Sequence, residues 1–197
     1  WDFKRFLDMK SNNIKTGKQF GNSILKNLIE IEEIISATIV GSFSENFNLN
    51  KIGDLDVVIV CKNVNKKIIK DAKNKVKFLK FKKKKIKINT SFGPIKFDPK
   101  KYLTIHLMIY DIKSHMEHTL RSPFTCYDWE RSNWYRGKKL SSIFPVLNLQ
   151  LRDFFEARRS ASEYLKDLKG NKISYRDYAF KKKEKTLKKK YFKIENK

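Results

Sequence analysis

The stretch from Thr38 to Val60 constrains the fold more than any other part of the chain. It reads TIVGSFSENFNLNKIGDLDVVIV: a β-prone apolar run, a Gly-Ser turn, a polar loop and a second β-prone run. Apolar, β-branched runs that are bounded by turn residues predict strands. The sequence therefore predicts a strand, a turn and a second strand at this position, and hence a sheet in the first part of the chain.

The second predicted strand carries two acids, Asp54 and Asp56. Side chains alternate between the faces of a strand, so both carboxylates point to one face and the apolar residues around them point to the other. Neighbouring carboxylates repel each other unless a cation lies between them, and such oxygen ligands suit Mg²⁺, which takes its other ligands from water and substrate phosphates. Gly41 and Ser42 complement this pair, because a residue without Cβ lets the backbone approach a phosphate, and hydroxyl and amide groups donate to it.

This pattern resembles the signature of the DNA polymerase β superfamily of nucleotidyltransferases, in its compact stand-alone or antibiotic-modifying type: Gly-Ser, an eleven-residue gap and D-x-D at the start of an apolar strand. The resemblance is close over residues 38–60 and looser over 25–145. It implies that Gly41 and Ser42 hold a nucleoside triphosphate, for example ATP. It also implies that Asp54 and Asp56 bind Mg²⁺, or alternatively Mn²⁺, and orient an acceptor. The implied reaction transfers a nucleoside monophosphate to a hydroxyl or phosphate of a small molecule or an RNA and releases pyrophosphate.

The run from Tyr102 to Tyr110 predicts a further strand, because it is rich in β-branched and aromatic residues. The superfamily pattern expects a third carboxylate on such a strand, and His106 stands in its place. His106 is predicted to lie in the catalytic site. There it acts as a metal ligand or as a general base, or its presence in place of a carboxylate means that catalysis has been lost. Asp98 and Asp111 frame the strand and are the alternative third acids.

An aromatic and basic segment follows, between residues 121 and 145. Aromatic rings stack on bases and guanidinium groups pair with phosphates, so this segment is predicted either to form one wall of the nucleotide or acceptor cleft or to be a packed loop between domains. Arg131 and Arg136 are the candidate nucleotide-binding cations. The stretch WYRGKKL also resembles the loop that leads from the catalytic domain to C-terminal helices in many of these enzymes.

Helical patterns alternate with the predicted strands. Apolar residues recur at three- and four-residue steps over 18–35, 64–81 and 147–168, and Gly170 closes the last of these helices. The residues from 171 onward predict either a last basic helix or a frayed tail. The expected class is therefore α/β, a small mixed sheet with packed helices and a short helical C-terminal part. The expected divisions are a nucleotidyltransferase core (1–120), a connecting segment (121–145) and a C-terminal helical segment with a basic tail (146–197).

Charge and composition narrow the range of partners and compartments. The formal net charge of +24 favours an anionic partner such as a triphosphate or RNA. Only eight of the 45 basic residues are Arg, however, and an excess of Lys over Arg is also expected from an AT-rich coding sequence. No signal-peptide pattern and no apolar run of membrane-spanning length occurs in the sequence. Two cysteines, of which Cys61 is expected in the core, fit a reducing compartment. A cytoplasmic protein without a membrane partner is expected.

Two other interpretations of the same scaffold stay open. The basic composition and the missing third acid also fit a non-catalytic protein that binds RNA or tRNA. Alternatively, the domain is a toxin-like transferase module that modifies a protein or a tRNA end.

Overall fold

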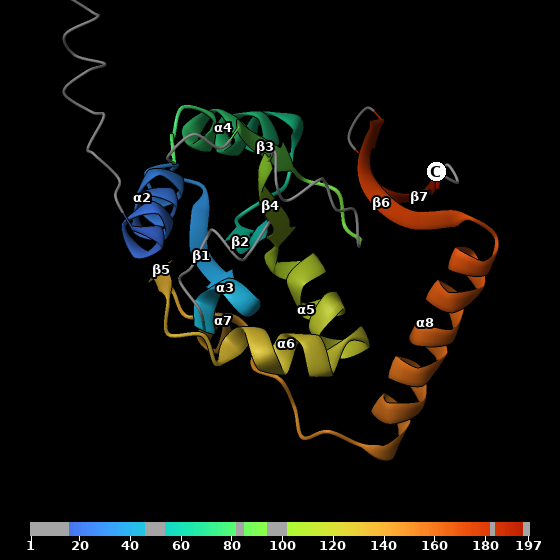
Figure 1. Cartoon of the computed structure of the whole chain (residues 1–197). Coiled ribbons are helices and arrows are strands. Elements are labelled where there is room, and N and C mark those ends of the chain that lie inside the picture. The colour runs from blue at the N-terminus through green and yellow to red at the C-terminus, as the bar shows by residue number, and fades with distance from the viewer. Residues whose placement is uncertain (1–15, 46–53, 82–84, 94–101, 182–183, 195–197) are drawn as a thin grey trace, which may run out of the picture.

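The computed structural model describes residues 16–45, 54–81, 85–93, 102–181 and 184–194, and its centre is a five-stranded mixed sheet in the order β3-β4-β2-β1-β5 (Figure 1). The strands are β1 (Ile34–Val40), β2 (Asp54–Cys61), β3 (Lys85–Asn89), β4 (Tyr102–Asp111) and β5 (Tyr135–Gly137). Strand β1 pairs antiparallel with β2 and β5, whereas β4 runs parallel to β2 and β3. The predicted α/β class with a small mixed sheet is confirmed.

Helices α2 (Gly17–Ile29) and α4 (Lys66–Lys77) cover one face of this sheet (Figure 1). The larger hydrophobic core lies between them and the strands, and it includes the fully buried Phe20 of α2, Ile68 of α4 and Val57 of β2. Side chains of this kind supply most of the stabilising free energy of a small domain, roughly 1.5–3 kcal/mol each. The apolar face that the spacing predicts for each helix is therefore the face that packs on the sheet.

Helix α2 ends earlier than its sequence pattern predicts. Thr16 and Gln19 form a capping box at its start, and the last helical residue is Ile29 rather than Ile35. Ile34 keeps the helical spacing of apolar residues but pairs with Cys61 in the sheet. β-branched residues favour strands, and the buried sheet contacts outweigh a helical periodicity that continues by coincidence.

The opposite face of the sheet is covered by α5 (Ile112–Arg121), α6 (Pro123–Glu130) and α7 (Leu140–Ile143), while α3 (Ser42–Glu45) directly follows β1. A second core lies on this face, where Val58 of β2 and Tyr110 of β4 meet Trp129 of α6. By strand alternation Asp54 and Asp56 share the face of Val58, but both are only half-buried. The acids therefore lie on the covered face at the end of the strand where the cover becomes incomplete.

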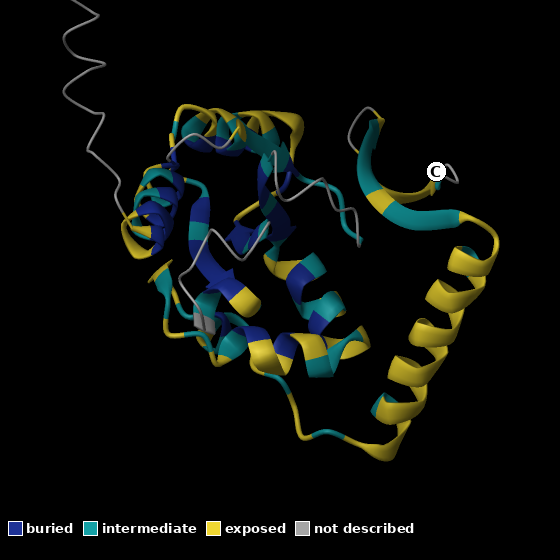
Figure 2. Cartoon of the chain, viewed as in Figure 1, coloured by how far each residue is buried: buried dark blue, intermediate teal, exposed yellow. Residues whose placement is uncertain are grey.

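The C-terminal part leaves the body of the protein as helix α8 (Leu151–Lys169) and returns as a hairpin of β6 (Lys172–Lys181) and β7 (Glu184–Lys193). None of the residues of α8 is buried, and Figure 2 shows the helix exposed along almost its whole length. Gly170 caps α8 as predicted. The prediction of a last basic helix or a frayed tail is wrong, because these residues form the β6–β7 hairpin. Tyr178 and Phe180 lie two positions apart on one face of β6, and both pack against the larger core.

The two cysteines are buried and unpaired, which confirms the prediction that Cys61 belongs to the core. Burial raises the pKa of Cys61 to about 12 and that of Cys126 to about 11. Both thiols are therefore protonated and unreactive near neutral pH. Among the helices of the described residues, none has the length and apolar character that crossing a membrane requires.

Candidate active site

The turn after β1 brings Gly41 against a carboxylate of β2. Gly41 has a φ of +74°, in the left-handed region that residues other than glycine rarely adopt. A Cβ atom at this position would lie 3.1 Å from Oδ2 of Asp56. The antiparallel pairing of Val40 with Asp56 sets this approach. The two halves of the predicted motif, which are separated by eleven residues in the sequence, therefore meet in space.

Strand β4 adds His106 to this edge of the sheet. Its parallel pairing with β2 places Thr104 opposite Asp54 and His106 opposite Asp56. Nδ1 of His106 lies 3.1 Å from Oδ1 of Asp56. Of the residues that the sequence predicts for catalysis, Asp56 and His106 are thus in direct contact, and Asp54 lies two positions before Asp56 on the same strand face.

The hydrogen bonds of His106 define where its protons lie. Nε2 is 2.6 Å from the backbone carbonyl oxygen of Ser91, which can only accept, so Nε2 carries a proton. Nδ1 faces a carboxylate oxygen of Asp56, so a second proton lies between these two groups. Burial alone would lower the pKa of His106, but the hydrogen bonds with Asp56 and Ser91 and the charges of Asp56 and Asp54 outweigh burial and raise it. These contacts favour the imidazolium form of His106.

This arrangement assigns different surroundings to the two oxygens of Asp56. Oδ1 accepts from His106, whereas Oδ2 faces the turn at Gly41. Both ring nitrogens of His106 are engaged, so neither presents a lone pair to a metal ion in this arrangement. The side chain of His106 is 14% exposed and that of Asp56 is 33% exposed, so solvent reaches the acid more readily than the base.

Asp111, an alternative third acid, lies at the wrong end of the sheet. It pairs with Cys61, at the opposite end of β2 from Asp54. Its carboxylate caps α5 by accepting from the backbone N–H of Ser114 at 2.9 Å, and it forms an ion pair with Lys185. Burial would raise the pKa of Asp111, but the hydrogen bonds from Lys185 and Ser114 lower it. Asp111 is therefore a structural acid, and Asp98, the other alternative, lies outside the described residues.

The paired carboxylates Asp54 and Asp56 are the residues of this edge that could hold a metal ion. Within the described ranges, no group of three or more His, Cys, Asp or Glu side chains is arranged to hold a metal ion. Mg²⁺ is commonly held by one or two protein carboxylates, with water and substrate phosphates as its remaining ligands. Asp54 and Asp56 fit such a site, whereas they do not form an all-protein cage.

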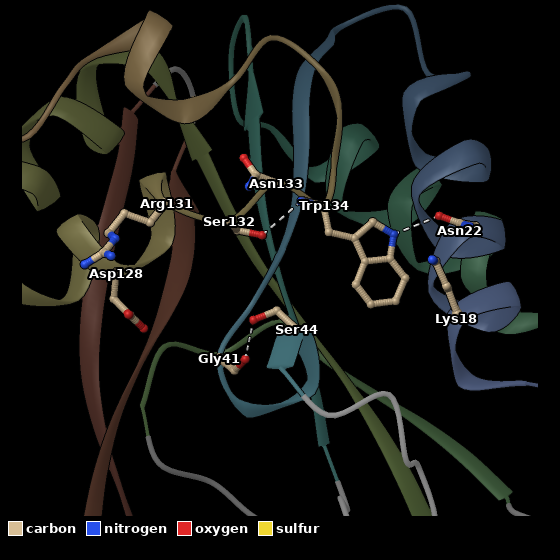
Figure 3. A pocket seen from close by; sticks show the side chains of 9 residues that line it. All are labelled: Lys18, Asn22, Gly41, Ser44, Asp128, Arg131, Ser132, Asn133 and Trp134. Carbon is tan, nitrogen blue, oxygen red and sulfur yellow. Dashed lines mark hydrogen bonds between the residues drawn. The ribbon is translucent and has the colours of Figure 1, made fainter.

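A cavity of about 620 Å³ opens beside Gly41 (Figure 3). Helix α2 supplies one side of it, and the end of α6 with the segment after it supplies the other. The lining residues are Lys18, Asn22, Gly41, Ser44, Asp128, Arg131, Ser132, Asn133 and Trp134. Its size is within the range of sites that hold drug-sized ligands. Since Gly41 belongs to both, the cavity and the carboxylate edge are adjoining parts of one site.

Trp134 forms an aromatic wall of the cavity and is held on three sides. Its Nε1 donates to Oδ1 of Asn22 at 2.7 Å, and its ring stacks on Phe43 with a centroid distance of 5.4 Å. The indole approaches α2 so closely that a Cβ on Gly21 would lie 2.5 Å from it. Residues 128 and 131–134 of the predicted aromatic and basic segment thus line a cavity together with α2, a partner that the sequence did not predict.

The two predicted arginines have different positions. Arg131 lines the cavity, whereas Arg136 is exposed on β5 opposite Ala37. Directly opposed residues share a face of an antiparallel pair. Ala37 is on the face of β1 that packs on α2, and Val40, which is opposite Asp56, is on the other. Arg136 therefore points away from the acid edge.

Ser42 also differs from its predicted position, since it is exposed at the start of α3 and does not line the cavity. Ser44 lines the cavity instead, and its hydroxyl donates to the carbonyl oxygen of Gly41 at 2.6 Å. Sequence reasoning also missed Lys18 and Asn22, because the pattern of α2 indicates its buried face and not which polar residues meet a distant segment.

Asn89 is a further polar residue at the edge that the sequence does not single out. It pairs with His106 across β3 and β4, and it is 8% exposed. Its Oδ1 accepts from the backbone N–H of Ser91 at 2.9 Å, while its Nδ2 has no hydrogen-bond partner among the described residues. Asn89 thus shapes the loop that carries the carbonyl acceptor of His106.

Compared with protein-family models, with curated proteins and with solved structures, the chain matches none of them.

Proposed function

We propose that this protein is a metal-dependent nucleotidyltransferase, which transfers a nucleoside monophosphate from a nucleoside triphosphate to an acceptor hydroxyl or phosphate. One observation carries the proposal: the glycine of the Gly-Ser turn faces Oδ2 of Asp56 and also lines the cavity. A triphosphate that occupies the cavity would therefore place its phosphates beside the carboxylate edge. The Gly-Ser and D-x-D resemblance adds to this geometry and implies the same reaction.

Asp54 and Asp56 are the residues that would hold Mg²⁺ or Mn²⁺. When bound, the ion neutralises charge on the phosphates and polarises the α-phosphate. His106 donates to Oδ1 of Asp56 and so fixes the carboxylate with Oδ2 toward the turn. His106 is then a positioning residue rather than a metal ligand or a general base, because both of its nitrogens already donate.

The cavity residues would bind the nucleotide. The ring of Trp134 offers a flat apolar wall for a base, and Arg131 and Lys18 offer positive charge for the outer phosphates. The backbone at Gly41 can approach a phosphate because no Cβ intervenes. In the reaction the bond between the α-phosphorus and its bridging oxygen breaks. A bond from the acceptor oxygen to the α-phosphorus forms, pyrophosphate leaves, and the proton of an acceptor hydroxyl passes to solvent.

The reaction is tested by following label and pyrophosphate. Each α-labelled NTP is incubated with the protein, with Mg²⁺ or Mn²⁺, and with a pool of small molecules or total RNA. The Asp54→Asn/Asp56→Asn variant is expected to lose pyrophosphate release and label transfer. The control variant Glu156→Gln/Glu163→Gln removes the same number of charges from exposed positions of α8 and should keep both. Equal turnover by the wild type and the Asp54→Asn/Asp56→Asn variant would refute the proposal.

The nucleotide site is tested by the two arginines. Arg131→Gln removes a charge from the cavity wall, so KM for the NTP is expected to rise about tenfold, which corresponds to a lost charge-assisted contact of about 1.4 kcal/mol. Arg136→Gln makes the same chemical change on the opposite face of the sheet and should leave KM unchanged. If the two variants bind NTP equally well, the cavity is not the nucleotide site.

A further inference from the structure

The positive charge of the C-terminal part is concentrated on the β6–β7 hairpin. Ten basic residues and two acidic residues lie between Lys172 and Lys193, whereas α8, immediately before, carries five basic and four acidic residues. A coding bias toward Lys would raise the positive charge of both neighbouring elements. The concentration on one of them points instead to an anionic partner at the hairpin.

Strand β7 is the outer strand of the hairpin and presents its charge to solvent. On one side β6 pairs with Phe92 of the body, and on its other side it pairs with β7. Every residue of β7 except Lys185 is exposed. Among the described residues, Lys188 and Lys193 have no carboxylate within ion-pair distance, and Lys189 has only Asp167, at 4.0 Å. These ammonium groups are available to phosphates.

Two aromatic rings lie among these lysines. Tyr191 is 49% exposed and Phe192 is 59% exposed, and the rings point to opposite faces of the strand. The ammonium groups of Lys172 and Lys189 lie 4.7 Å and 5.3 Å from the ring centroid of Tyr191. Exposed rings flanked by cations are the combination that binds single strands, because bases stack on the rings while phosphates contact the cations.

The hairpin is also joined to the candidate active site by a chain of hydrogen bonds. Asp177 of β6 accepts from Lys190 at 2.9 Å and from the hydroxyl of Ser91 at 2.5 Å. The carbonyl oxygen of Ser91 in turn accepts from His106, the partner of Asp56. Strand β6 therefore connects the outer strand β7 to the loop that borders the carboxylate edge.

We propose that the β6–β7 hairpin binds single-stranded nucleic acid through its phosphates and bases. If the chain is the nucleotidyltransferase proposed above, the end of such a strand is its acceptor, and this assignment of the acceptor rests on the proposed function. Strand binding does not depend on the proposed function, because it involves none of the residues of the carboxylate edge. The hairpin recognises a polynucleotide by charge and stacking, so RNA and DNA single strands share the relevant chemistry, and the RNA or DNA arm of a binding assay decides the preference.

Binding is measured on the whole chain with labelled single-stranded RNA and DNA of about 12 nucleotides, as a function of salt. The variant Lys188→Gln/Lys189→Gln/Lys193→Gln is expected to lose at least about tenfold in affinity, and its slope of log K against log [salt] should fall by about 2, since each phosphate contact contributes about 0.7. The variant Lys66→Gln/Lys70→Gln/Lys77→Gln removes the same charge from the exposed face of α4 and should change affinity by less than about twofold.

The stacking contribution is separated from charge by the variant Tyr191→Ala/Phe192→Ala. It should lose about tenfold in affinity for the oligonucleotides and keep its affinity for inorganic polyphosphate, which has no bases. Circular dichroism and thermal unfolding check that each variant is folded. The Asp54→Asn/Asp56→Asn variant should bind strands as the wild type does while it loses transfer. If the wild type itself binds strands but transfers no label, only the enzyme proposal is refuted.

Three outcomes would overturn the hairpin proposal. The first is an equal loss of affinity in the α4 and hairpin lysine variants, which would mean that the charge acts without a defined site. The second is binding to phosphatidylserine-containing vesicles but not to oligonucleotides, which would identify an anionic membrane surface as the partner. The third is wild-type affinity in both hairpin variants.

Discussion

His106 and the pair His115 and His118 are close in sequence and lie on the same side of the molecule, yet their surroundings favour opposite charge states. His106 has an acceptor at each ring nitrogen, and its pKa is raised. On α5, both ring nitrogens of His115 and Nε2 of His118 are buried without a hydrogen-bond partner among the described residues. Burial lowers the pKa of each of these two histidines to about 4, and for His118 the charges of Arg176 and His115 add to this.

The difference lies in the neighbours rather than in the burial. The ring of His118 stacks on Tyr110 at a centroid distance of 5.3 Å and lies 5.2 Å from Trp129. Aromatic rings provide packing but no acceptor that could compensate the loss of water around a charged imidazole. At the sheet edge, a carboxylate and a carbonyl provide that compensation. A buried histidine with hydrogen-bond acceptors at its ring nitrogens thus has a raised pKa, whereas buried histidines that pack against aromatic rings have a lowered pKa.

The sharpest way to break this contrast is to remove the carboxylate beside His106. In Asp56→Asn, burial is no longer outweighed by a negative partner, so the pKa of His106 is expected to fall and to approach the behaviour of His115. The proposed transfer activity should fall by roughly a thousandfold, as for loss of a central electrostatic group. Histidine ring resonances followed by NMR against pH measure the first effect. Asp71→Asn, on α4, is the control and should leave the His106 titration unchanged.

The next effect is acid destabilisation through α5. The folded-state pKa values of His115 and His118, about 4, are below the ordinary value of 6.5, so the unfolded chain binds more protons between these limits. The free energy of unfolding is therefore constant with respect to these groups above pH 6.5 and falls as the pH drops from 6.5 to 4, by up to about 3 kcal/mol for each histidine.

Urea unfolding at several pH values between 7 and 4 measures this slope. His118→Phe keeps an aromatic ring between Tyr110 and Trp129 but cannot be protonated, so it should remove about half of the acid-dependent loss. An unchanged slope in His118→Phe and in a matching His115→Leu variant would mean that neither histidine is neutral in the folded protein.

His106 should give a smaller pH effect of opposite sign. Its folded-state pKa is raised, so its contribution to stability is complete below the ordinary value of 6.5 and is lost as the pH rises through the raised value. His106→Gln is therefore expected to be less stable than the wild type by about 1 kcal/mol at pH 6, with a smaller difference at pH 9. Unfolding curves at the two pH values test this. A stability difference that does not vary with pH would contradict an ion pair between His106 and Asp56.

The smallest expected effect separates the two acceptors of the loop. Ser91→Ala removes the hydroxyl that donates to Asp177 but keeps the backbone carbonyl that accepts from His106. A loss of about 0.5–1 kcal/mol in unfolding free energy is expected, with no change in the titration of His106. A shifted titration would show that the hairpin contact, rather than the carbonyl alone, sets the charge of His106.

The local features of the candidate site were predictable from the sequence, and the distant contacts were not. The strands at Asp54 and at His106 follow from runs of β-branched residues, and the shared face of Asp54 and Asp56 follows from strand alternation. Two features could not be predicted: that Ser44 rather than Ser42 lines the cavity, and that Arg136 is exposed. The first depends on how α3 turns, and the second depends on the register in which β5 pairs with β1. The C-terminal hairpin was missed because its many lysines make the alternation of Tyr178 and Phe180 hard to recognise in the sequence. Only the packing of these two rings against the larger core shows that they belong to a strand.

The sequence by itself determined the elements and the polar residues that they carry: an apolar strand with an acid pair, a glycine turn before it and a histidine on a later strand. Tertiary structure decided which of these residues touch and therefore what charge they hold. Pairing of β2 with β4 places His106 beside Asp56, whereas packing of α5 on the sheet leaves His115 without an acceptor among the residues that the structure describes. The identity of a side chain fixes its ordinary pKa, but its charge inside a protein depends on the acceptors and the water around it, and only the folded chain arranges those.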